Sequence, residues 1–115
     1  MDNLLSKIHN LEDIADYQKD SIVSKIIIEK DSGSVTYFAF DKDQGLSEHT
    51  VPFDAMVIII DGDAEITISG ENHQLHKNEM IIMPAQKPHA LKAINKFKML
   101  LTNWRWFRIL KYIER

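Results

Sequence analysis

Histidine is the residue type through which this sequence has most scope for chemistry, because imidazole binds metal ions and transfers protons near neutral pH. The histidines are His9, His49, His73, His76 and His89. His49 and His89 each follow a loop that contains glycine or proline, and each enters a predicted strand. In a barrel, such positions lie at the mouth or line the interior. We therefore take His49 and His89 as the candidate functional pair.

The remaining histidines have simpler interpretations. His9 lies in a predicted helical segment, where we expect a solvated or packing residue. His73 and His76 lie in or beside a polar turn and are expected to face solvent. The sequence has no cysteine, which excludes disulfides, thiolate metal sites and cysteine nucleophiles. It also has no glycine-rich phosphate loop and no nucleophile elbow.

Many short strands must position the two candidate histidines. Residues 22–29 and 35–40 are rich in β-branched and aromatic residues and flank a turn sequence, which predicts a hairpin. Residues 57–60 form a continuous apolar run, and residues 64–68 alternate apolar with polar side chains. Further short strands are predicted at 73–75, 80–83, 89–93 and 97–101. This all-β pattern favours a sandwich or a barrel over residues 21–103.

The two ends of the chain differ from this strand pattern. Residues 1–20 are predicted as a helical lead-in, because apolar residues recur at intervals of three and four from Leu4 to Ile14. Residues 104–115 form a tail with a net charge of +3 and interleaved aromatic side chains. We expect the tail to pack on the barrel or on a second subunit. The alternative is a basic aromatic patch that contacts lipid or nucleic acid.

Length and charge limit the classes of function. The 115 residues suit one domain, with a formal net charge of −3. Because the overall charge is acidic, no general nucleic-acid footprint is expected. No apolar run is long enough to span a bilayer, and the first ten residues do not resemble a signal peptide. We therefore expect a cytoplasmic protein without membrane or nucleic-acid partners.

Two segments resemble the sequence motifs of the cupin superfamily. Residues 45–62, GLSEHTVPFDAMVIIIDG, are similar to its first motif, and residues 78–93, NEMIIMPAQKPHALKA, to its second. The likeness is strongest at Asp61-Gly62, Met83-Pro84 and Pro88-His89. It covers about residues 22–103 and implies a small single-domain cupin, a jelly-roll barrel known as the double-stranded β-helix. It also implies a homodimer, which would protect exposed strand edges.

Cupins often hold a divalent metal ion with three histidines and one glutamate, and this sequence departs from that set. His89 matches the histidine of the second motif in both possible alignments of the first motif. If the first motif is aligned on Gly62, His49 takes the position of its first histidine. Val51 then stands at the second histidine and Ala55 at the glutamate. If the motif is aligned instead on the spacing between its histidine and its glutamate, His49 takes the position of the second histidine. Asp54 then takes the glutamate position, and Ser47 stands at the first histidine. The resemblance therefore implies His49 and His89 as ligands of iron, manganese, nickel or zinc, with Asp54 as a third ligand in the second alignment.

The interior of such a barrel would be largely apolar. The predicted lining residues are Phe38, Phe40, Met56, Ile58 and Met83, with Ile60, Met80 and Ile82 as further candidates that depend on strand parity. Three functions stay open. The first is a small-molecule-binding barrel with a degenerate metal site. The second is a metal-dependent cupin enzyme of the dioxygenase or isomerase type. The third is an interaction protein that uses its basic tail.

Overall fold

The structure is a computed structural model that describes residues 4–104. It contains one short 3-10 helix, η1, and eight β-strands, which confirms the predicted all-β class. The elements are η1 (Leu11–Asp13), β1 (Ile22–Lys30), β2 (Gly33–Phe40), β3 (Gly45–His49), β4 (Ala55–Ile68), β5 (Glu71–His76), β6 (Met80–Met83), β7 (His89–Lys92) and β8 (Phe97–Trp104).

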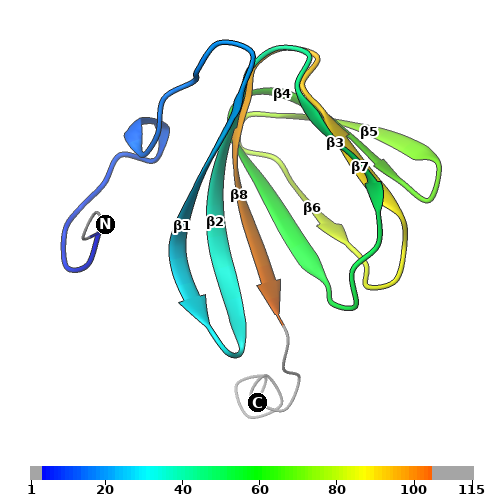
Figure 1. Cartoon of the computed structure of the whole chain (residues 1–115), viewed down its shortest axis with the longest axis horizontal. Coiled ribbons are helices and arrows are strands. Elements are labelled where there is room, and N and C mark those ends of the chain that lie inside the picture. The colour runs from blue at the N-terminus through cyan, green and yellow to red at the C-terminus, as the bar shows by residue number, and fades with distance from the viewer. Residues whose placement is uncertain (1–3, 105–115) are drawn as a thin grey trace.

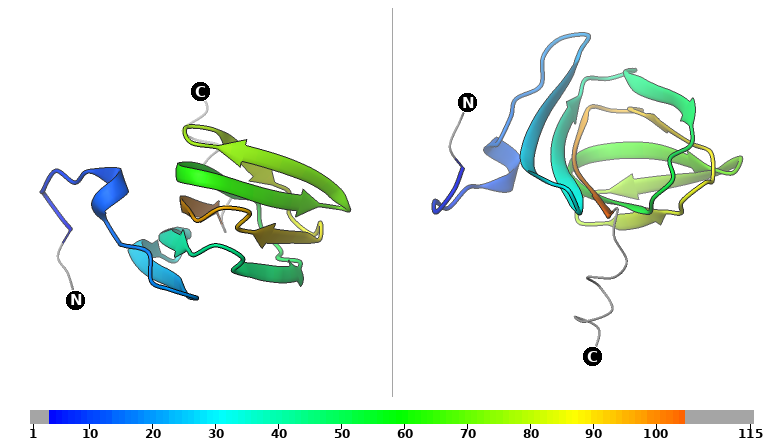
Figure 2. Two further views of the ribbon diagram at one scale, coloured as in Figure 1. Left: turned by 90° about the horizontal axis from the view of Figure 1, so that it is seen from above. Right: turned by 60° about the horizontal axis from the view of Figure 1, so that its bottom comes forward.

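The strands form two antiparallel sheets that curl around a common core (Figures 1 and 2). Sheet A has the order β1-β2-β8-β4-β6, and sheet B has the order β5-β4-β7-β3. Strand β4 is long enough to belong to both sheets. Its first half pairs with β6 and β8, and its second half pairs with β5 and β7. This shared strand joins the sheets into one barrel.

A register shift in β4 between Ile59 and Asp61 determines which side chains face the core. Before the shift the odd-numbered Val57 and Ile59 are buried, and after it the even-numbered Ala64 and Ile66 are buried. An inserted residue of this kind changes the alternation of a strand from one face to the other. The residues of the core come from both sheets: Phe40, Ala55, Val57, Ile59, Ala64, Ile66, Leu75, Met83, Leu91, Ala93, Phe97 and Met99.

Two glycines allow the close backbone approaches that this curl requires. Gly62 has a φ of 75°, and a Cβ there would lie 1.9 Å from the carbonyl oxygen of Lys96. A Cβ at Gly45 would lie 2.4 Å from the carbonyl oxygen of Leu91. Any side chain at these positions would push β8 or β7 away from its neighbour. Gly62 thus maintains the bend of β4, and Gly45 maintains the pairing of β3 with β7.

The N-terminal segment differs from its prediction. The amphipathic pattern predicted a helical lead-in over residues 1–20, but the only helical element in the described part of this segment is η1. Asn10 caps η1 by accepting a hydrogen bond from the Glu12 N–H. Ser6 has a φ of 60°, which interrupts a right-handed helix, and the Ile8 side chain is fully exposed. The apolar spacing therefore does not mark a face that packs on the barrel.

Polar contacts hold the segment on the outside of sheet A instead. The Tyr37 hydroxyl donates to the Leu11 carbonyl over 2.5 Å, and the Tyr17 hydroxyl donates to the Asp61 carboxylate over 2.6 Å. Lys98 donates to the Glu12 carbonyl, and its ammonium also lies 4.9 Å from the centre of the Tyr17 ring. Burial of the Tyr37 hydroxyl and nearby carboxylates raise its pKa to about 12. These contacts fix residues 11–17 beside β2 and β8.

Two further features concern the ends and the membrane. The basic aromatic tail predicted at 104–115 lies outside the described residues, except for Trp104 at the end of β8. No helix within residues 4–104 is long and apolar enough to cross a membrane.

Candidate functional site

The interior of the barrel changes in character from one end to the other. Register pairs place Phe40 beside Phe97, Phe38 beside Met99, and Met99 beside Ile59, on the inner face of sheet A. Phe40, Phe97, Ile59 and Met99 are completely buried and define what we call the aromatic end. The rings of Phe40 and Phe97 stack there with centroids 4.5 Å apart.

At the opposite end, which we call the histidine end, inward-facing side chains are more polar and several are partly exposed. This end is defined by Ser34, Thr36, His49, His89 and Asn103. It lies where β2 and β7 begin and where β3 and β8 end, toward the lower part of Figure 1. Because polar side chains from both sheets gather here, it is the candidate functional site.

His49 and His89 are brought together by the pairing of β3 with β7, in which they are direct partners. Their rings meet edge to face, with centroids 4.4 Å apart. His89 is only 3% exposed, whereas the His49 side chain is open to solvent. The structure thus joins two histidines that are 40 positions apart in the sequence.

Hydrogen bonds to the backbone determine which nitrogen of each ring holds the proton. The Nδ1 atom of His49 lies 2.8 Å from the Ser47 carbonyl oxygen, and the Nδ1 atom of His89 lies 3.3 Å from that of Lys87. A carbonyl oxygen only accepts, so each Nδ1 must carry hydrogen. In the neutral rings the Nε2 atoms are then unprotonated, and neither is bonded to another residue within 4–104. Each ring therefore presents a lone pair.

The environment keeps His89 neutral. Burial in the barrel is the main cause that lowers the pKa of His89, and the positive charge that His49 would acquire lowers it further. The hydrogen bond to the Lys87 carbonyl acts in the opposite direction and is the smaller effect. At neutral pH His89 is therefore uncharged, and it can accept a hydrogen bond or bind a metal ion.

Asp54 positions the loops beside the histidines. Its Oδ1 accepts a hydrogen bond of 2.8 Å from the Ala85 N–H, and the Gln86 N–H donates to the Val51 carbonyl over 2.8 Å. These two bonds tie the loop before β4 to the loop before β7. Because the loops flank β3 and β7, the bonds support the placement of His49 next to His89.

The side of the histidine end that belongs to sheet A was not anticipated from the sequence. Ser34 pairs with Asn103, and the Ser34 hydroxyl donates to the Asn103 side-chain oxygen over 3.3 Å. Thr36 lies one inward position further along β2. These residues belong to no motif. For Ser34 and Thr36 the available signal is their alternation with Phe38 along β2, because alternate residues of a strand share a face.

The predicted lining residues divide between the two faces of sheet A. Phe38 and Phe40 face the interior, and Met83 is part of the core. Met56 and Ile58 lie on the opposite, outer face, because their neighbours Ala55, Val57 and Ile59 occupy the inner positions of β4. Ile60 is buried near the register shift, while Met80 and Ile82 are about half exposed on the outer face.

The described residues do not fit the metal site that the family resemblance implied. Transition metals generally require three protein ligands or more. No group of three or more histidine, cysteine, aspartate or glutamate side chains is placed to hold a metal ion within residues 4–104. Asp54, the proposed third ligand, is instead engaged with the Ala85 N–H. Two imidazoles alone would hold a metal ion weakly.

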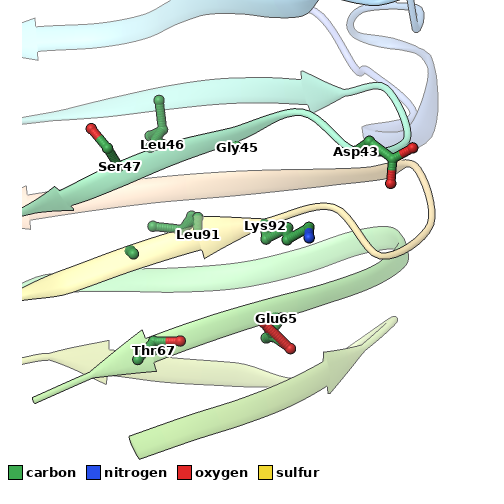
Figure 3. Close-up of a pocket in the computed structure, with 9 residues that line it drawn as sticks. Asp43, Gly45, Leu46, Ser47, Glu65, Thr67, Leu91 and Lys92 are labelled. Carbon is green, nitrogen blue, oxygen red and sulfur yellow. The ribbon is translucent and has the colours of Figure 1, made fainter. Parts of the chain in front are cut away.

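A groove of about 360 Å³ lies elsewhere, on the outer face of sheet B (Figure 3). Its floor is formed by small residues of β3 and β7, Gly45 and Ala90. Its walls carry the polar side chains of Asp43, Ser47, Glu65, Thr67 and Lys92. Leu46 and Leu91 also line the groove, and both pack with the core cluster, so the sheet separates the groove from the histidine pair. It is a second, polar candidate for ligand binding.

Comparisons with known proteins agree with this architecture. A model of the cupin domain family matches residues 36–103. A conserved protein of unknown function from Streptococcus pyogenes is 36% identical, with a TM-score of 0.84 over 88% of this chain and 89% of that chain. A cupin 2 conserved barrel domain protein from Leptotrichia buccalis is 34% identical, with a TM-score of 0.81 over 84% of this chain and 47% of that chain.

A cupin superfamily protein from Desulfitobacterium hafniense shares the fold at 23% identity, with a TM-score of 0.82 over 86% of this chain and 91% of that chain. No curated protein matches the sequence. The family model covers more than half of the chain, and the predicted jelly-roll barrel is confirmed by these structures. The chain therefore belongs to the cupin domain family and is a small single-domain cupin.

Proposed function

We propose that this cupin binds a small organic molecule at the histidine end of the barrel. The single observation that supports the proposal is the His49–His89 pair, whose rings meet at 4.4 Å with each Nδ1 bonded to a backbone carbonyl. The two Nε2 lone pairs would accept hydrogen bonds from the polar end of the ligand. Phe38 and Leu101 would contact its apolar part, since both face inward and are partly exposed.

A matched pair of probes tests the proposal. Phenol and toluene have similar size, but only phenol donates a hydrogen bond. We expect toluene to bind roughly 2- to 12-fold more weakly than phenol, since one hydrogen bond contributes about 0.5–1.5 kcal/mol. The difference should disappear in the His49→Ala, His89→Ala double variant. Equal binding of both probes by the unmodified protein, measured by titration calorimetry or NMR, would contradict the proposal.

A metal-dependent enzyme of the dioxygenase or isomerase type is the second candidate. The observation that favours it is the contact of each Nδ1 with a backbone carbonyl, which in the neutral ring leaves the Nε2 lone pair free to bind a metal ion. Elemental analysis of protein purified without a histidine tag or chelator tests it. Stoichiometric iron, manganese, nickel or zinc that is lost in the double variant would favour the enzyme. Absence of metal after reconstitution would favour the binding barrel.

The cytoplasmic location and the absence of membrane and nucleic-acid partners stay predictions from the sequence. A ligand retained during purification would give the chemical class directly, and native mass spectrometry would detect it as a mass difference that denaturation removes.

A further inference from the structure

The groove on the outer face of sheet B is formed where two outward side chains are very small. The register partners Gly45, Lys92 and Glu65 form one outward row across β3, β7 and β4. Ala90 and Thr67 are partners in the next outward row. Because Gly45 has no side chain and Ala90 has only a methyl group, the longer side chains around them enclose a hollow of about 360 Å³ (Figure 3).

The groove contains one ammonium group and two carboxylates. Lys92 and Glu65 are direct partners on neighbouring strands, and Asp43 lies in the loop before β3, where its N–H donates to the Ala93 carbonyl over 2.8 Å. Opposite charges at directly opposed positions of a sheet commonly interact. Among residues 4–104, however, neither Lys92 nor either carboxylate takes part in an ion pair. Within the described chain, both signs of charge are therefore available to a ligand.

The partners in an adjacent row of the same outer face behave differently. Asp63 and His76 are also direct register partners, on β4 and β5. Their side chains do meet, with the His76 Nδ1 atom 2.5 Å from an Asp63 carboxylate oxygen. The second oxygen of Asp63 accepts a hydrogen bond of 3.1 Å from the Asn95 side chain. The contrast shows that sheet B can satisfy its own polar groups, and that the charges of the groove are an exception.

The other lining residues restrict the class of ligand. The lining residues in the described part of the chain include no aromatic side chain and no arginine. Aromatic rings commonly stack on nucleobases, and arginine commonly binds phosphate, so the groove is poorly suited to both ligands. Ser47 and Thr67 contribute hydroxyl groups, and the Thr67 hydroxyl donates to the Asn72 side-chain oxygen over 2.5 Å, which leaves its lone pairs as acceptors. The lining therefore suits an aliphatic molecule that carries both charges.

We propose that this groove binds a small aliphatic zwitterion, the chemical class of free amino acids, with its carboxylate at Lys92 and its ammonium group at Glu65 and Asp43. The aliphatic part of the ligand lies over Ala90. Sites for small molecules commonly have volumes of about 300–1,000 Å³, and the groove is near the lower end of this range. The site is separate from the histidine end, because the sheet lies between them.

Three probes with the same carbon chain test the proposal. 4-Aminobutanoate carries both charges, butanoate carries only the negative charge, and butylamine carries only the positive charge. We expect 4-aminobutanoate to bind about 2- to 5-fold more tightly than either other probe, because an exposed ion pair contributes little more than this. NMR titration of the full chain should show shifts at residues 43–47, 65–67 and 90–92. Equal affinity for the three probes, or shifts confined to other residues, would overturn the proposal.

Variants that keep the size of the side chains identify which charge binds which end of the ligand. Asp43→Asn with Glu65→Gln should bind 4-aminobutanoate and butanoate equally, because the partners of the ammonium group are removed. Lys92→Met should bind 4-aminobutanoate and butylamine equally. The matched control, Glu29→Gln with Lys30→Met on the exposed end of β1, should leave all three affinities unchanged. A preference for the zwitterion that persists in both groove variants would contradict the assigned contacts.

A last pair of variants locates the site. Ala90→Phe fills the hollow and should remove binding of all three probes, and the variants that keep side-chain size provide the test if this chain does not fold. The His49→Ala, His89→Ala double variant should bind 4-aminobutanoate as the unmodified protein does. Loss of binding in that double variant would place the probe inside the barrel and would overturn the proposal, whereas loss of phenol binding alone would concern only the histidine end.

Discussion

The two ends of the barrel interior share strands β2 and β8 but have different composition. The aromatic end contains Phe40, Phe97, Ile59 and Met99, all without solvent exposure. The histidine end contains Ser34, Thr36 and Asn103 on sheet A and His49 and His89 on sheet B. Close packing at one end stabilises the fold, and partly exposed polar groups at the other leave hydrogen-bonding capacity for a ligand. The comparison separates residues that hold the barrel together from residues that we propose bind its ligand.

Truncation of a ring at the aromatic end should have the largest effect. Phe97→Ala should lower the free energy of unfolding by about 3–5 kcal/mol, because it removes a stacked and completely buried side chain. Thr36→Ala at the histidine end should cost less than about 1 kcal/mol. Chemical denaturation of both variants measures the difference. Equal losses would show that the two ends do not differ in their contribution to stability.

Glycine substitutions sharpen the comparison at the bend of β4 beside the aromatic end. Gly62→Ala should cost about 3 kcal/mol, the sum of a left-handed backbone and a clash with the Lys96 carbonyl. Gly70→Ala is the matched control, since its φ is 82° but no atom lies within 4 Å of the added Cβ. It should cost about 1–2 kcal/mol. Similar losses in thermal or chemical unfolding would exclude the clash as a cause.

The pH dependence of stability distinguishes a histidine inside the barrel from one outside. The folded-state pKa of His89 is lowered, so the unfolded chain binds a proton more readily. Stability should therefore decrease as the pH falls below about 6.5 and through the folded-state pKa. His89→Gln should remove this part of the slope. An unchanged profile of melting temperature between pH 7.5 and 5 would argue against a buried neutral His89.

His76 should contribute with the opposite sign. The Asp63 carboxylate lies 2.5 Å from its Nδ1 and raises the pKa of His76. Its stabilising effect should be complete below the unfolded pKa of about 6.5 and should be lost as the pH rises through the folded-state pKa. His76→Gln should therefore change the slope in the reverse direction from His89→Gln. The same sign for both variants would contradict the assigned environments.

The sequence was informative where one face of a strand is polar and ambiguous where both faces are apolar. The alternation from Ala64 to Ile68 indicated the inner face correctly, because sheet B has a polar exterior. The run from Val57 to Ile60 carried no such signal, because sheet A is apolar on both faces. Met56 and Ile58 could therefore not be separated from the inner residues until the register was known.

Other features were determined by contacts distant in sequence. The helix was predicted because the apolar residues have helical spacing. The prediction was wrong because Tyr17 and Tyr37 fix the segment through polar contacts with distant residues. The pairing of His49 with His89 was suggested by the cupin motifs. The contribution of Ser34 and Asn103 required the pairing of β2 with β8, which no local pattern reveals.

The most direct test of the central claim is a long-range ¹H–¹⁵N NMR spectrum of the imidazole rings at pH 7, recorded with and without phenol. The account predicts that His89 is neutral, that both rings carry hydrogen on Nδ1, and that phenol shifts their Nε2 resonances. A proton on Nε2 of His89, or phenol-induced shifts confined to the outer groove at Glu65, Thr67 and Lys92, would contradict it.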